Sequence, residues 1–156
     1  FMQTQGGNNN PYNQDNETSW LNWDRLREND DVFRFFKHMI AFRKAHPSIS
    51  RSRYWREDIK WYGADHLVDM SPTSQQLAYS LHGASQSDND LYVMINAAWY
   101  ATEFGIYEGS PGTWRRIVDT SLPSPSDFAA SPFETVNQTS YTVKGRSVVV
   151  LVSATK

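Results

Sequence analysis

The spacing of apolar residues changes at Pro47, and this change limits the folds open to the chain. Before it, side chains from Asp31 onward repeat with the period of an α-helix. After it, short segments typical of β-strands alternate with clusters of Gly, Pro, Asn and Ser. The pattern predicts one amphipathic helix at about residues 30–45, followed by a mainly β region. The apolar face of this helix would carry Val32, Phe35, Phe36, Met39, Ile40 and Phe42.

The ends of the expected helix carry residues that favour helix boundaries. Asn29 can cap free backbone amides, and Asp30 and Asp31 place negative charge in the first turn, where it complements the helix dipole. Lys44 places positive charge near the other end, and Pro47 cannot continue the helix. These signals support the same helix bounds as the apolar period.

Seven segments after the helix have the composition of β-strands. Residues 91–96 alternate between the two faces of a strand, and 148–152 form a continuous apolar run, as in a buried strand. Short strands at regular spacing, joined by turns, predict an antiparallel β-sandwich. The seven segments are residues 59–62, 76–81, 90–97, 102–107, 114–118, 140–143 and 147–153.

Charge and composition exclude several classes of partner. The net charge is −2, and the 15 basic residues are scattered along the chain, so we expect no binding to nucleic acid. No apolar run approaches the roughly 20 residues needed to span a bilayer, so we expect no membrane partner. Cysteine is absent, which excludes disulfides and thiolate metal sites. We expect a cytoplasmic protein.

The motifs of several common catalytic and cofactor sites are absent from the sequence. The four histidines lack metal-binding spacing, no G-x-S-x-G stands before a nucleophile, and GGNNN at residues 6–10 lacks the lysine and spacing of a phosphate-binding loop. We therefore predict no metal site, no cofactor and no hydrolase triad in this chain.

The stretch QGGNNNPYNQDNETSW, residues 5–20, is rich in side-chain amides and framed by Tyr12 and Trp20. An amide offers a donor and an acceptor that match paired sugar hydroxyls, and an aromatic face accepts the apolar face of a pyranose ring. The same composition also suits a structural, Asn-rich turn. Residues 1–28 are expected to form a long loop with one helical turn near 23–26.

The stretch TQGGNNNPYNQDNETSWLNW, residues 4–23, resembles a segment of the isoamylase and glycogen-debranching branch of the α-amylase superfamily. In that branch the pattern follows the last strand of the catalytic (β/α)8 barrel. FRKAHPSI at residues 42–49 is similar to the end of the last barrel helix. Three later segments resemble successive segments of the family's C-terminal domain. They are DIKWYG (58–63), DLYVMINA (90–97) and TWRRIVDTSLPSPSDF (113–128).

The resemblance implies a parent enzyme that hydrolyses α-1,6 branch linkages in glycogen or starch through three carboxylates. In the family those carboxylates lie on barrel strands that precede the equivalent of Phe1, so we predict that this chain alone is inactive. Residues 1–50 would be a barrel remnant, a long loop and one helix, and 51–156 a C-terminal antiparallel β-sandwich with a stabilising role.

The same resemblance implies that the opening loop lines or supports the cleft that holds the α-glucan. The residues that match the family motif and are assigned to substrate binding are Asn8, Asn9, Asn10, Tyr12, Gln14, Asp15, Asn16 and Trp20.

Two further hypotheses follow from the sequence. One is a stand-alone α-glucan-binding module, whose exposed aromatic residues would come from Trp55, Trp61, Tyr62, Trp99 and Tyr100; the alternative for each is packing in the core. The other is self-association through the helix face of Val32, Phe36, Met39 and Ile40, which would pack on barrel strands in a parent enzyme.

Overall fold

The computed structural model describes residues 2–51, 57–129 and 133–154. Contacts group the chain into two compact units, Phe1–Ala41 and Phe42–Lys156, which are described separately below. The grouping does not test the predicted boundary between residues 50 and 51, which stays a prediction.

The α-helices that the structure describes lie in the first third of the chain. They are α1 (Arg25–Glu28), α2 (Asp30–Ala45) and α3 (Pro47–Ser50). The bounds of α2 confirm the predicted helix, and the Asn29 carbonyl oxygen accepts a hydrogen bond from the Phe33 amide at 3.1 Å. The short α3 is not predicted by periodicity; it begins at Pro47, whose fixed φ suits the first helical position.

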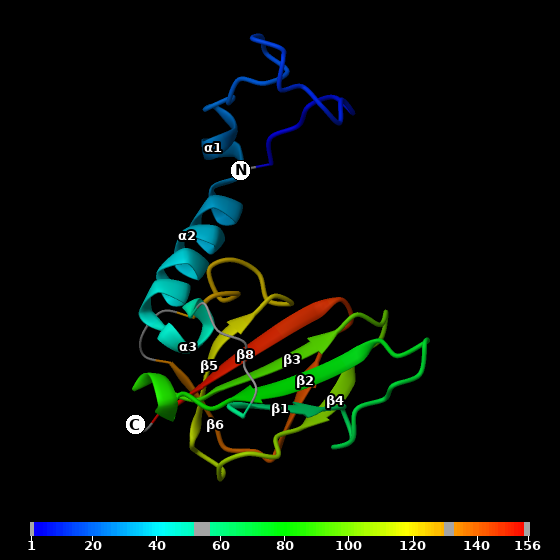
Figure 1. Cartoon of the computed structure of the whole chain (residues 1–156), viewed down its shortest axis with the longest axis vertical. Helices are drawn as coiled ribbons and strands as arrows, with labels where there is room; N and C mark the ends of the chain where they lie inside the picture. Colours follow the sequence, from blue (N-terminus) through cyan, green and yellow to red (C-terminus); the bar gives the residue numbers. More distant parts are fainter. Residues whose placement is uncertain (1, 52–56, 130–132, 155–156) are drawn as a thin grey trace. The chain divides into compact units, whose positions relative to one another are not determined.

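The second unit contains an antiparallel sheet of six strands (Figure 1). In spatial order these are β1 (Ile59–Tyr62), β2 (Gln76–Leu81), β3 (Leu91–Asn96), β8 (Ser147–Ser153), β5 (Trp114–Asp119) and β6 (Glu134–Val136). A second, two-stranded antiparallel sheet pairs β4 (Thr102–Gly105) with β7 (Ser140–Val143). A short 3₁₀ helix, η1 (Ala84–Gln86), lies between β2 and β3 in the chain.

The hydrophobic core takes side chains from both sheets. Tyr92 pairs with Leu151 and Met94 with Val149 across β3 and β8, so these four side chains lie on one face of the larger sheet. Phe104 of β4 and Val143 of β7 complete the same buried cluster. Each of these side chains is fully buried or nearly so. Burial favours apolar side chains, which accounts for the apolar residues at these strand positions.

The mainly β, antiparallel architecture confirms the predicted fold class. The bounds of β1, β2, β7 and β8 agree with the predicted ones. β6 is missed because its three residues, Glu-Thr-Val, are too few to show an alternating pattern. β4 is shorter than predicted: its pairing with β7 ends at Gly105, and the next amide, of Ile106, bonds to the Thr139 carbonyl outside the strands.

Candidate functional site

The opening loop, residues 2–24, is shaped by its own asparagines. The side-chain oxygen of Asn8 accepts a hydrogen bond from the Asn10 amide at 3.0 Å, and that of Asn16 accepts one from the Thr18 amide at 2.9 Å. Asn22 bonds the Asp24 amide in the same way at 3.0 Å. Asparagine makes such turns because its short side chain reaches the backbone two residues on. Part of the amide richness is therefore structural.

The two ends of the loop are tied together by Gln3. Its side-chain nitrogen donates to the Trp20 carbonyl oxygen at 3.0 Å, and its side-chain oxygen accepts from the Asn22 amide at 3.2 Å. The Trp20 indole N–H donates to Asp15 Oδ1 at 2.7 Å, which fixes the ring within the loop. Sequence reasoning missed Gln3, because nothing in its local pattern shows a partner 17 or 19 residues away.

The structure places all eight predicted glucan-binding residues in the first unit. Tyr12 is 86% exposed and Trp20 is 55% exposed. Direct hydrogen bonds join Asp15 to Trp20 and Asn8 to Asn10. Among the described residues, no hydrogen bond engages the side-chain amides of Asn9 and Asn10, so both can meet sugar hydroxyls. The glucan-binding role of the eight residues stays a prediction.

The aromatic candidates of the second unit separate into exposed and buried residues. Trp99 and Tyr100 follow β3 and are strongly exposed, and Trp61 of β1 is 51% exposed. Tyr62 is only 7% exposed and belongs to the core, so its proposed place on a binding surface is wrong. Trp55 lies outside the described residues.

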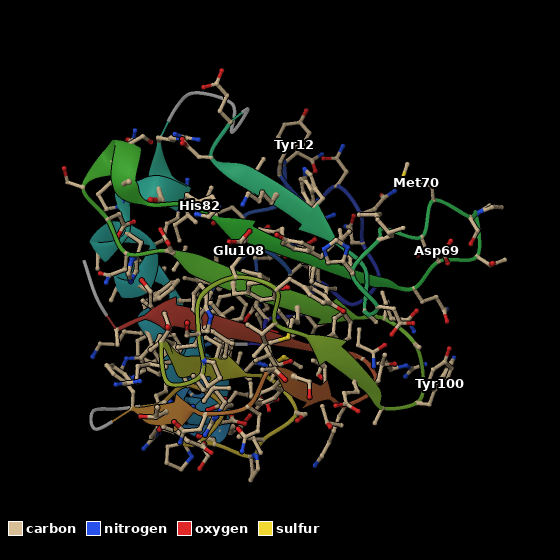
Figure 2. All side chains as sticks on the ribbon, turned by 90° about the horizontal axis from the view of Figure 1, so that it is seen from below. Tyr12, Asp69, Met70, His82, Tyr100 and Glu108 are labelled. Atoms are coloured by element: carbon tan, nitrogen blue, oxygen red, sulfur yellow. The ribbon has the colours of Figure 1, made fainter. Side chains whose placement is uncertain are left out.

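Glu108, which is labelled in Figure 2, has one basic and one phenolic hydrogen-bond partner in the second unit. Its Oε1 accepts hydrogen bonds from Tyr62 Oη at 2.5 Å and from Lys60 Nζ at 2.8 Å. Burial favours the neutral carboxyl, but these two bonds outweigh it and hold the pKa of Glu108 below its usual value. Burial and the Glu108 carboxylate raise the pKa of Tyr62. The pair links β1 to the segment before β5.

Asp58 is also ionised by its neighbours. Hydrogen bonds from Arg51 at 2.6 Å and from Ser85 at 2.8 Å lower the pKa of this carboxyl group.

No group of three or more His, Cys, Asp or Glu side chains that could hold a metal ion occurs in the part of the chain that the structure describes. Among the same residues, no helix is both long and apolar enough to cross a bilayer.

Comparisons with known proteins place this architecture in a family. The family described as "Isoamylase 1-3, C-terminal" matches residues 60–151, more than half of the chain. The isoamylase of Flavobacterium sp. is 29% identical over 97% of this chain and 22% of its own length. The glycogen debranching enzyme of Dickeya chrysanthemi is 28% identical over 85% of this chain and 18% of its own length. The chain thus spans about a fifth of these relatives.

A solved structure supports the fold. The pullulanase of Bacillus acidopullulyticus matches 96% of this chain and 17% of its own chain, with a TM-score of 0.71 at 20% identity. The likeness concerns the arrangement of the strands. Together with the family match over β1 to β8, it shows that the chain belongs to the family of isoamylase C-terminal domains.

Proposed function

We propose that the chain is the C-terminal part of a cytoplasmic debranching enzyme that hydrolyses α-1,6 linkages of glycogen or starch. In this proposal residues 51–156 stabilise the enzyme and take no part in catalysis. The observation that carries it is the coverage of the relatives: nearly the whole chain matches the Flavobacterium isoamylase, yet it accounts for only 22% of that protein.

The state of the carboxyl groups supports a non-catalytic role. A glycosidase needs a general acid whose raised pKa keeps it protonated at neutral pH. Among the described residues, the shifted carboxyl groups are Asp58, Asp88 and Glu108, and the pKa of each is lowered. Each is also engaged by hydrogen bonds with a neighbour, so none suits this task.

The opening loop has a different part in the proposal. Tyr12, Trp20 and the unengaged amides of Asn9 and Asn10 would line the glucan cleft of the parent enzyme. The exposure of both rings and the hydrogen bonds that fix Trp20 are consistent with this role.

The inactivity of the chain is tested by incubating it with amylopectin or glycogen and measuring new reducing ends. We expect no release above a buffer blank, with a complete isoamylase as the positive control. Turnover by the purified chain would contradict the proposal.

Sequencing the DNA upstream of this chain tests whether the chain belongs to a longer debranching enzyme. We expect the DNA upstream of the codon for Phe1 to encode a barrel with three carboxylates in the same reading frame. The complete coding region should then yield soluble, active enzyme, and its truncation before residue 51 should remove both properties. A stop codon directly upstream would favour the stand-alone glucan-binding module instead.

Self-association is a second part of the proposal. Phe36 and Ile40 of α2 are both more than half exposed, and Val32 and Met39 lie on the same apolar stripe. We expect a second copy of the chain to cover this stripe when the chain is studied alone. Sedimentation velocity at increasing concentration should show a dimer, and Phe36→Lys should reduce it; a monomer throughout would refute this part.

A further inference from the structure

Two adjacent aromatic side chains stand out from the turn between β3 and β4. Trp99 is 76% exposed and Tyr100 is 64% exposed, whereas the preceding residue, Ala98, is fully buried. Figure 2 shows Tyr100 at the rim of the sheet, away from the core. Large aromatic side chains that stay in water on an otherwise folded turn mark a candidate binding surface.

The buried side chain of Asn96 holds the backbone of this turn in place. This last residue of β3 is buried, and its Nδ2 lies 2.8 Å from the Tyr100 carbonyl oxygen and 3.1 Å from that of Val143. The Lys144 carbonyl oxygen lies 3.2 Å from the same nitrogen, so two N–H groups are shared among three acceptors. Asn96 Oδ1 accepts from the Ala98 amide at 3.1 Å. The amide therefore joins the β3–β4 turn to the end of β7.

The β7–β8 turn packs directly against the same segment. The Arg146 amide donates to the Ala98 carbonyl oxygen at 2.9 Å. A Cβ on Gly145 would lie 2.4 Å from the Trp99 carbonyl oxygen, so only glycine fits there. The Arg146 guanidinium carbon lies 3.0 Å from the centre of the Trp99 ring, a cation–π contact that holds the ring in place.

We propose that Trp99 and Tyr100 form a surface site for a neutral α-glucan chain, remote in sequence from the opening loop. The proposal rests on the proposed function, because the substrate class comes from there. A pyranose ring offers an apolar C–H face to an aromatic ring, and its hydroxyls can accept hydrogen bonds from Arg146. Because the backbone and the Trp99 ring are fixed before binding, little conformational entropy is lost.

Affinity electrophoresis of the 156-residue chain in gels with and without glycogen tests the site. We expect glycogen to retard the wild type, and Trp99→Ala and Tyr100→Ala each to abolish most of the retardation. Titration with maltoheptaose should show a dissociation constant raised about tenfold or more in each variant, as for other well-placed aromatic contacts. Both side chains are exposed, so thermal unfolding should change little.

Two control variants separate this site from other aromatic surfaces. Trp61→Ala removes another half-exposed ring of the same unit and should leave the retardation intact. Tyr12→Ala reports on the opening loop and should lower the retardation much less than Trp99→Ala does. Equal retardation of all variants, or loss only with Tyr12→Ala, would overturn the proposal, as would a wild type that migrates freely.

Salt distinguishes a neutral glucan from an anionic ligand of Arg146 and Lys144. Binding to a neutral sugar should persist at high ionic strength, whereas binding to an anion should weaken. Retardation that depends on Trp99 but disappears in salt would overturn the assignment to a glucan. A negative result in the gel would not contradict the proposed debranching enzyme, because that proposal is tested by the upstream coding sequence.

Discussion

The His46 ring donates a hydrogen bond from Nδ1 to Asp88 Oδ1 across 2.8 Å. Both side chains are largely buried, and the second oxygen of Asp88 accepts the Ser48 amide at 3.1 Å. The contact joins the residue before α3 to the loop between η1 and β3. One carboxylate thus anchors the segment after α2 to the sandwich.

Asp88→Asn should destabilise the second unit by about 2 kcal/mol at pH 7, because a hydrogen bond to a charged group contributes more than one between neutral groups. The free energy of unfolding in urea measures this change. Glu57→Gln, the same change at an exposed position, is the control and should stay within about 0.5 kcal/mol of the wild type. Equal effects of the two substitutions would refute the anchoring role.

The free energy of unfolding should fall in acid because Asp88 and Glu108 become protonated. Burial opposes the charged form of Asp88, but hydrogen bonds from Ser48, His46 and Asn89 outweigh it and lower its pKa. Because both carboxyl groups have a lower pKa in the folded state, their contribution is complete above about pH 5. It is lost as the pH falls through the folded-state values. Urea unfolding from pH 6 to pH 2.5 should show this, with a weaker pH dependence in Asp88→Asn.

The free energy of unfolding should also fall in alkali because of three tyrosines, two of them buried and one, Tyr141, partly buried. Burial raises the pKa of Tyr92 to about 12, and burial together with a neighbouring carboxylate raises the pKa of Tyr62 and Tyr141. The folded state holds these phenols protonated, so their contribution is complete below about pH 10 and is lost above it, where the unfolded chain ionises. Absorbance at about 295 nm should show that part of the eight tyrosines ionises only as the protein unfolds; titration of all eight near pH 10 in the folded state would contradict this.

Asn96→Ala should destabilise the fold by about 3 kcal/mol, since it leaves several backbone groups of two turns without their partner. Urea unfolding at pH 7 measures the loss. Asn137→Ala is the matched control, because Asn137 is exposed in the turn between β6 and β7. A loss below about 1 kcal/mol for Asn96→Ala would show that water replaces the amide.

The elements with a strong local period were predictable, and the contacts between them were not. The apolar stripe of α2 and the β-branched run of β8 depend on neighbours in the chain, so both were found with nearly the correct bounds. The hydrogen bonds of the Asn96 side chain join residues up to 48 positions apart, and no local pattern reveals them. Trp61 and Tyr62 show the same limit: adjacent strand residues face opposite sides, but the sequence cannot tell which side is the core.

The place of β8 in the sheet affects how the chain can be made. It is the last strand that the structure describes, yet it lies between β3 and β5 (Figure 1). During synthesis, therefore, β1–β3 and β5–β6 emerge as two half-sheets whose facing edges have unpaired backbone groups until residue 153 leaves the ribosome. Unpaired edges invite pairing with other chains, so both edges are open to aggregation until β8 fills the gap between them.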